Sequence, residues 1–166
     1  MLHYNNVNPQ AGILDSSGLR FHYTPKLRSY DAGVLEVGLE YTDKNSIPPG
    51  MVTPLAGYCV SECTRAAMSG SIRSDSAGQE GIYIFAAQMH THLTGVASWT
   101  EHVREGRLIE ELQRDGHYLA HFQEIRLLKE PIQIAPGDAL IHYCFYTRQR
   151  TNMTLGGFAG RLSHLQ

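Results

Sequence analysis

The chain has 166 residues, 42% of them hydrophobic and 18% charged, with a formal net charge of −2. This composition is typical of a folded domain with its own core and excludes a disordered chain. Lysine and arginine are scattered and no apolar run approaches the roughly 20 residues that cross a bilayer, so neither a nucleic-acid partner nor a membrane-spanning helix is expected.

Strand patterns fill the first third of the chain. Apolar and polar residues alternate over residues 18–24, up to a proline, and again over residues 32–41, which predicts two strands. The run Ser-Ile-Pro-Pro-Gly at 46–50 then breaks the chain. Helix signals are poor, because only residues 62–68 predict a short helix, and a loop rich in Ser, Gly and Asp follows over residues 69–80.

The rest of the chain predicts further strands separated by turns. Residues 81–92 are rich in β-forming side chains, and a hairpin turned at Glu105-Gly106 follows, with arms at 98–104 and 107–112. The remaining strand candidates are residues 122–128, 132–134 and 139–146, the last after a turn at 135–138. Many short strands with regular turns predict an antiparallel β-sandwich of the jelly-roll type, with little helix, as a single domain over 1–166.

Cys59, Cys63 and Cys144 leave at least one thiol without an internal partner. The C-x3-C spacing of the first two suits a zinc site, but a second ligand pair is missing nearby. We therefore interpret the cysteines as members of disulfides whose partners lie outside this chain. Residues 1–6 do not predict a signal peptide, whereas Asn152 begins an Asn-Met-Thr glycosylation sequon that matters only in a secreted protein.

The most informative motif is His90-Thr91-His92. On an extended strand, residues i and i+2 point to the same face, so both imidazoles can reach one metal ion. Imidazole suits copper, zinc and iron alike. Strand histidines are often plain surface residues, but residues 82–87 predict a buried strand, and polar rings at its end need partners. The motif predicts a metal site that takes a third ligand from elsewhere.

The other histidines and methionines carry weaker patterns. His117 and His121 are four residues apart, but no helix is predicted there, so we interpret them and His142 as loop or surface residues. His3 is unremarkable by spacing alone. Two methionines could offer thioethers to Cu(I), with core packing as their default role. These are Met153 and Met89, and Met89 should point away from the face of its neighbouring histidine.

Nine strings, in order along the chain, resemble the copper type II, ascorbate-dependent monooxygenases, and the similarity is greatest to the branch of dopamine and tyramine beta-hydroxylases. The resemblance covers essentially the whole chain up to Phe158. The strings are LHYNN at 2–6, DSSGLR at 15–20, DAGVLEVGL at 31–39, IPPG at 47–50, GYC at 57–59, MHTHLTG at 89–95, HFQEIR at 121–126, PGD at 136–138 and LGGF at 155–158.

The resemblance implies a copper site. The family carries two separated coppers in two jelly-roll domains. His90 and His92 match two ligands of the catalytic copper, and His3 matches the third histidine of the electron-transfer copper. Because that copper's other histidines belong to an N-terminal domain, we expect a C-terminal catalytic domain, incomplete at both ends. Copper and ascorbate are the implied cofactors, and the secretory vesicle lumen or the extracellular space is the implied location of the full-length protein.

The end of the chain departs from the family's pattern. The family's catalytic copper also takes a methionine six residues after the Gly-Gly-Phe turn, and His164 stands at that position. A thioether favours Cu(I), but imidazole also binds copper, so His164 is a ligand candidate. The resemblance also implies that the partner of Cys144 follows that methionine and that those of Cys59 and Cys63 lie farther along. We interpret the chain as a fragment or a product with a diverged tail, less stable by about 2–5 kcal/mol for each missing disulfide.

The resemblance also indicates a substrate class. Peptide-hydroxylating relatives hold a substrate carboxylate with an arginine two residues before the first ligand histidine, and here that residue is Gln88. A neutral amide fits an amine better than a carboxylate. A phenolic amine is a cation, so Glu36 is a candidate partner, with a solvated strand residue as the equal alternative. Tyramine or dopamine and O2 are the implied small-molecule partners, and a homo-oligomer stays open for the full-length protein.

Three functional hypotheses follow. The first is a copper monooxygenase that hydroxylates the benzylic carbon of a phenylethylamine with O2 and ascorbate, as in catecholamine or octopamine biosynthesis. The second is a catalytically inactive copper-binding or partner-binding domain, because one histidine cannot hold the electron-transfer copper well. The third is a zinc hydrolase that uses His90, His92 and a carboxylate.

Overall fold

The computed structural model describes residues 12, 14, 16–39, 42–69, 81–147 and 151–156. The chain divides into two units, residues 1–34 and residues 35–166, and every helix and strand of the described residues lies in the second unit.

The predicted strand at 18–24 is wrong, because its residues are exposed and belong to no strand. The strand predicted at 32–41 is also absent over residues 32–39, the part that the structure describes. An alternating pattern becomes a strand only when a partner strand accepts its backbone hydrogen bonds. Leu19, Phe21 and Tyr23 remain 70%, 80% and 93% exposed, so the alternation buries no face.

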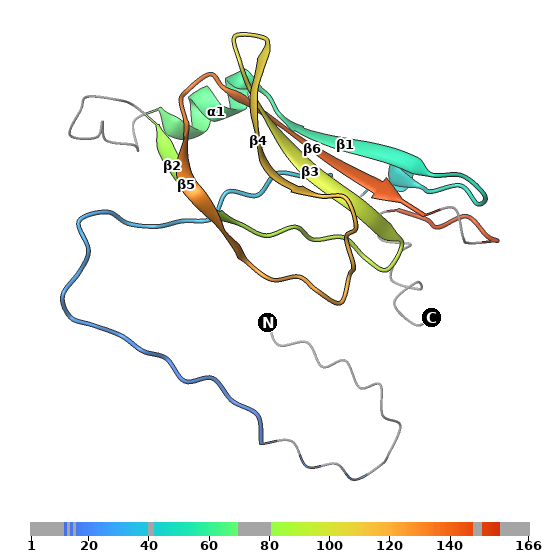
Figure 1. The fold of residues 1–166 in the computed structure, drawn as a ribbon, viewed down its shortest axis with the longest axis horizontal. Coiled ribbons are helices and arrows are strands. Elements are labelled where there is room, and N and C mark those ends of the chain that lie inside the picture. Colours follow the sequence, from blue (N-terminus) through green and yellow to red (C-terminus); the bar gives the residue numbers. More distant parts are fainter. Residues whose placement is uncertain are drawn as a thin grey trace. The chain divides into compact units, whose positions relative to one another are not determined.

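The regular elements of the second unit are mostly antiparallel strands (Figure 1). One sheet has the order β1-β6-β3-β4 and the other pairs β2 with β5, which confirms the predicted antiparallel β-sandwich. Within the described residues, no helix is long and apolar enough to cross a membrane. The elements are η1 (Asp43–Asn45), β1 (Thr53–Cys59), α1 (Ser61–Met68), β2 (Ile82–Ala87), β3 (Gly95–Arg104), β4 (Arg107–Asp115), β5 (Arg126–Ile134) and β6 (Ala139–Tyr146).

The core joins both sheets and α1. Met68, Leu112, Ile134 and Leu140 form its buried centre, and they come from α1, β4, β5 and β6. Partly buried apolar side chains pack around them, including Ile82 and Ile84 of β2.

The strand β2 corrects one expectation from the sequence. Tyr83 and Phe85 are 45% and 52% exposed, so β2 is buried on one face only and not on both. A run of six apolar residues is compatible with a strand at the edge of a core, which has one exposed face, as well as with a strand buried on both faces.

Two turns form where the sequence predicts them. Glu105 and Gly106 both have positive φ, 51° and 74°, which gives the turn geometry that matches the twist of the β3–β4 hairpin. At 135–138 the Asp138 N–H donates to the Ala135 carbonyl at 3.0 Å, and Gly137 has a φ of 99°. A glycine after a proline supplies that conformation at low cost. The predicted helix is confirmed as α1.

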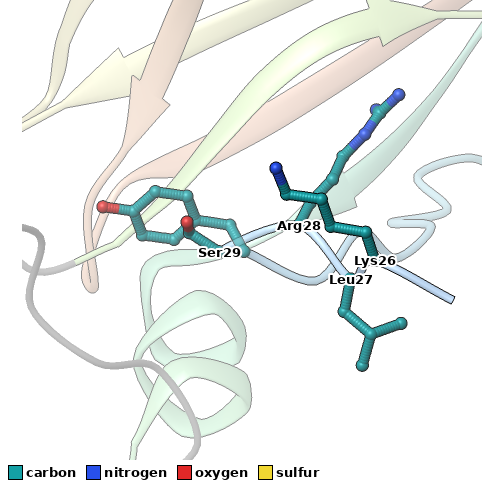
Figure 2. Close-up of a pocket in the computed structure, with 5 residues that line it drawn as sticks. Lys26, Leu27, Arg28 and Ser29 are labelled. Atoms are coloured by element: carbon teal, nitrogen blue, oxygen red, sulfur yellow. The ribbon is translucent and has the colours of Figure 1, made fainter.

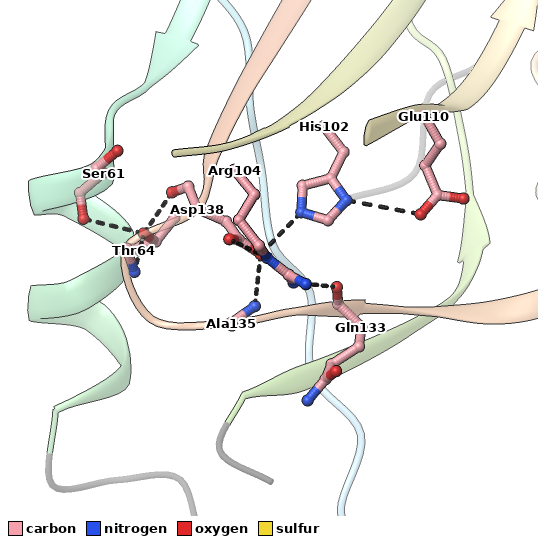
Figure 3. Close-up of polar contacts among 9 residues, drawn as sticks. Ser61, Thr64, His102, Arg104, Glu110, Gln133, Ala135 and Asp138 are labelled. Atoms are coloured by element: carbon pink, nitrogen blue, oxygen red, sulfur yellow. Dashed lines mark hydrogen bonds and ion pairs between the residues drawn. The ribbon is translucent and has the colours of Figure 1, made fainter. Parts of the chain in front are cut away.

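A buried carboxylate connects this second turn to the rest of the core (Figure 3). Asp138 is 2% exposed and accepts hydrogen bonds from His102 Nε2 at 2.7 Å and from Arg104 Nε and Nη2 at 2.8 Å each. The Ala135 N–H donates to the same side chain at 2.8 Å, and the Thr64 hydroxyl of α1 donates to the Asp138 carbonyl at 2.6 Å. One residue thus holds α1, β3 and the β5–β6 turn together.

Burial alone raises the pKa of Asp138, but the hydrogen bonds from Arg104, the Ala135 N–H and His102 outweigh it and lower this pKa to about 2. Because the folded-state pKa lies below the ordinary value of 3.8, the interaction stabilises the fold fully above about pH 4 and is lost as the pH falls through 2. The shift corresponds to roughly 2 kcal/mol.

We therefore expect Asp138→Asn to lower the free energy of unfolding near neutral pH by about 3–5 kcal/mol, because His102 and Arg104 lose a buried carboxylate. The variant should also lose the part of the wild-type pH dependence that falls between pH 4 and 2. Urea unfolding measured from neutral pH down to about pH 2 follows both effects. Glu124→Gln is the control, since its exposed pair with Arg126 contributes little. Equal acid sensitivity in wild type and Asp138→Asn would contradict the assignment.

Candidate metal centre

The predicted histidine pair lies just beyond β2, in an extended segment that is not part of either sheet. Its side chains alternate, because Met89 and Thr91 are 5% and 4% exposed while His90 and His92 are exposed. The expectation that both histidines share one face and that Met89 points the other way is therefore confirmed. The expectation that both imidazole rings are buried at the end of a buried strand is wrong, because both rings face outward.

The two rings lie against each other in an edge-to-face arrangement. Their centroids are 5.3 Å apart and the ring planes meet at 89°. Rings this close can each offer a nitrogen to one ion. Among the residues that the structure describes, no group of three or more His, Cys, Asp or Glu side chains could hold a metal. The described residues therefore bring two imidazoles within reach of one ion and do not form a complete metal site.

Tyr118 fixes the backbone between the two histidines. Its hydroxyl accepts from the Thr91 N–H at 2.9 Å and donates to the Thr91 carbonyl at 3.1 Å. Tyr118 is 4% exposed, so both backbone groups are satisfied inside the protein. This pairing turns the Thr91 side chain inward and leaves the neighbouring rings on the outer face.

Gly95 leaves room for the inward-facing Thr91 side chain. Its amide donates to the His92 carbonyl at 2.8 Å, which closes a tight turn after the motif. A side chain at this position would collide with the Thr91 side chain. The glycine is therefore required by the close approach of Thr91 to the turn.

A second contact joins the motif to the loop between β4 and β5. His90 Nδ1 lies 2.5 Å from Gln123 Oε1, and the Gln88 side-chain amide donates to the Gln123 backbone carbonyl. Gln123 Nε2 in turn donates to the Ala120 carbonyl at 2.5 Å. Gln88 and His90 are thus brought together by a residue that sequence reasoning missed. Gln123 lies within the HFQEIR string, but neither its spacing nor its residue type pointed to the histidines.

The other candidate site residues that the structure describes are not gathered around the histidine pair. Glu36 is exposed, and no contact among the described residues joins it to the histidines. Asn152 is exposed, as glycosylation would require. His117 and His121 are exposed and lie outside the strands, as predicted. His3 and His164, like the loop at 70–80, lie outside the described residues.

His142 corrects an expectation. It was predicted on the surface but is only 8% exposed in β6, where its ring nitrogens contact Ser98 Oγ at 3.1 Å and Thr100 Oγ1 at 2.8 Å. Burial lowers the pKa of His142, which favours the neutral ring. The alternation with Leu140 and Cys144 on the same inward face could have revealed this burial.

The cysteines form no disulfide with one another. Burial, and then the neighbouring Cys63 thiol, raise the pKa of Cys59. Burial likewise raises the pKa of Cys144. Higher pKa values favour protonated thiols, which are weaker nucleophiles and metal ligands than thiolates.

One surface hollow lies in the first unit (Figure 2). Its lining is a single run of five exposed residues, Lys26 to Tyr30. None of the predicted site residues belongs to it. A hollow made by one stretch of chain brings no distant side chains together, so it supports no site.

Comparison with known proteins identifies the family. Residues 30–161 match the family model of the copper type II ascorbate-dependent monooxygenase, C-terminal domain. The chain belongs to this family. It is 43% identical over 159 residues to tyramine beta-hydroxylase from Caenorhabditis briggsae, and 46% identical over 159 residues to dopamine beta-hydroxylase from Bos taurus. A DBH-like monooxygenase protein 1 from Homo sapiens is 40% identical over 162 residues.

These matches cover 95–96% of the chain but only 25–26% of the relatives. The chain therefore spans about a quarter of the length of the curated copper monooxygenases that it matches, and it corresponds to their C-terminal domain.

Tyr118→Phe should lower the free energy of unfolding by about 1–3 kcal/mol, because the buried Thr91 N–H and carbonyl both lose their partner. It should also shift the NMR resonances of both neighbouring histidine rings. The control is Tyr58→Phe, which removes a hydroxyl from a tyrosine that is 63% exposed. Equal stability of the two variants would show that the Thr91 contacts are not formed.

Proposed function

We propose that this chain provides the catalytic-copper half of an ascorbate-dependent monooxygenase that hydroxylates the benzylic carbon of a phenylethylamine of the tyramine or dopamine type. Membership of the copper monooxygenase family supports the reaction class. The observation that carries the proposal is the edge-to-face pair of His90 and His92, whose ring centroids are 5.3 Å apart.

The residues present fit copper in their donor chemistry, since imidazole nitrogen is a common copper ligand. His90 and His92 would hold the ion from one side. Bound copper would supply oxygen chemistry that amino-acid side chains cannot perform, with ascorbate as the source of electrons. The protein's part is to orient both rings, and the Tyr118 contacts with Thr91 perform it.

The remaining ligand and the second copper are proposed from the family. His164 occupies the position of the family's methionine ligand, and His3 that of one electron-transfer ligand. Gln88, beside the histidines, is proposed to favour an amine over a carboxylate substrate, with Glu36 as a candidate partner of the ammonium group. The full-length protein would act in the secretory vesicle lumen or outside the cell, with disulfides at its cysteines and a glycan at Asn152.

We expect the 166-residue chain to bind Cu(I) through His90 and His92. Replacing both by alanine should weaken binding at least 100-fold, since both imidazole ligands are lost. Competition with a chromophoric Cu(I) chelator measures the affinity. The matched control is the double variant His117→Ala and His121→Ala, which removes two exposed histidines outside the motif. Equal weakening by both double variants would refute the assignment.

Metal analysis separates copper from zinc. Protein produced with both metals available should retain copper, and loss of copper in the His90/His92 variant should not be accompanied by a gain of zinc. Retention of zinc alone would favour the hydrolase hypothesis instead.

The isolated chain should hydroxylate tyramine poorly, because the only histidine that it offers for the electron-transfer copper is His3. Product formation with copper, ascorbate and O2 can be compared with an equal amount of full-length bovine dopamine beta-hydroxylase. A comparable rate from the isolated chain would show that it needs no second copper domain. Binding of copper without any turnover, even after the missing domain is supplied, would support the inactive-domain hypothesis.

A further inference from the structure

The loop between β4 and β5 approaches the histidine motif at two points. Tyr118 contacts the Thr91 backbone, and five residues later Gln123 contacts the His90 ring. A turn in which the Phe122 N–H donates to the Leu119 carbonyl at 2.8 Å connects the two points. The loop is therefore held against the motif at Tyr118 and at Gln123.

The direction of the hydrogen bond between Gln123 and His90 follows from the amide's other contact. Gln123 Nε2 donates to the Ala120 carbonyl, so Oε1 is the atom that faces the imidazole and can only accept. The reversed amide would place two carbonyl oxygens against each other at Ala120. His90 Nδ1 must therefore carry the proton, and in the neutral ring Nε2 keeps its lone pair.

We propose that Gln123 is a positioning residue that selects the Nδ1–H tautomer of His90 and aims Nε2 outward as the metal-binding atom. The positioning role rests on the proposed copper site, but the tautomer of His90 is a property of the metal-free protein. Metal-binding histidines commonly donate their second ring N–H to a carbonyl, carboxylate or water, which fixes the tautomer and the ring direction. Here a side-chain amide performs that role.

Gln88 strengthens the arrangement from the other side. Its side-chain amide donates to the Gln123 backbone carbonyl, so the segment that carries His90 also holds the backbone of its hydrogen-bond partner. Movement of the loop away from the motif would break the Gln88 and His90 contacts together. If Gln123 only filled space, it would need neither its contact with Gln88 nor its contact with His90.

Three substitutions test the proposal. Gln123→Leu removes the acceptor at similar size, Gln123→Glu keeps an oxygen acceptor, and Gln123→Asn keeps the amide but shortens its reach. The matched control is Glu124→Leu, in the same loop, which breaks an exposed pair with Arg126. Long-range 1H–15N NMR of the metal-free chain above about pH 8, where histidine is ordinarily neutral, reports the tautomer of His90.

Wild type, Gln123→Glu and the Glu124→Leu control should show the Nδ1–H form of His90. Gln123→Leu and Gln123→Asn should shift the ring toward the Nε2–H form. Their Cu(I) affinity should fall about 10–100-fold, as is typical when the partner of a metal-binding histidine is lost. Gln123→Glu keeps the acceptor for His90 but loses the donor to the Ala120 carbonyl, so its affinity should fall less than that of Gln123→Leu.

An unchanged tautomer in Gln123→Leu, or in Gln123→Asn if the leucine variant does not fold, would overturn the proposal. Failure of the proposed function has a different signature. If the tautomer changes as expected but wild type does not bind Cu(I), the positioning role stands and the copper assignment fails. If Cu(I) binds through His90 and His92 but the tautomer is insensitive to Gln123, the copper site stands and the positioning role fails.

Discussion

The structure depends most on one buried carboxylate. Asp138 accepts from His102, Arg104 and the Ala135 N–H, and its backbone carbonyl accepts from Thr64. Buried ionised groups persist only when such contacts replace water. Because these donors come from β3 and the β5–β6 turn as well as α1, the network determines how the helix and the second turn sit on the sheet, and the small apolar core fills the space between them.

The two histidines of the candidate metal centre are positioned by loop contacts and not by pairing within a sheet. β2 ends at Ala87, before the motif begins, so no sheet ladder holds His90 and His92 in place. Tyr118 and Gln123 take over that function from the loop after β4. The placement of the histidine pair therefore depends on the β4–β5 connection, although the pair itself is recognised in sequence as the end of a strand.

Patterns that depend on local chemistry were predictable from the sequence. The Glu105-Gly106 hairpin, the turn before Asp138, the helix at 62–68 and the alternation of the histidines all follow from nearby residue types. The strand at 18–24 failed because alternation cannot show whether a partner strand exists. His142 and Gln123 were missed because burial in β6 and a contact 33 residues away in sequence both depend on the tertiary fold.

The exposure of the two rings sets what a complete site must add. A copper ion held only by His90 and His92 would face water, whereas the surrounding apolar shell controls solvent access and redox behaviour. Leu93, the residue after the motif, and Phe122, the residue before Gln123, are 58% and 67% exposed, so these apolar side chains do not shield the rings from water. A complete site therefore needs groups that shield the ion from water as well as a further ligand.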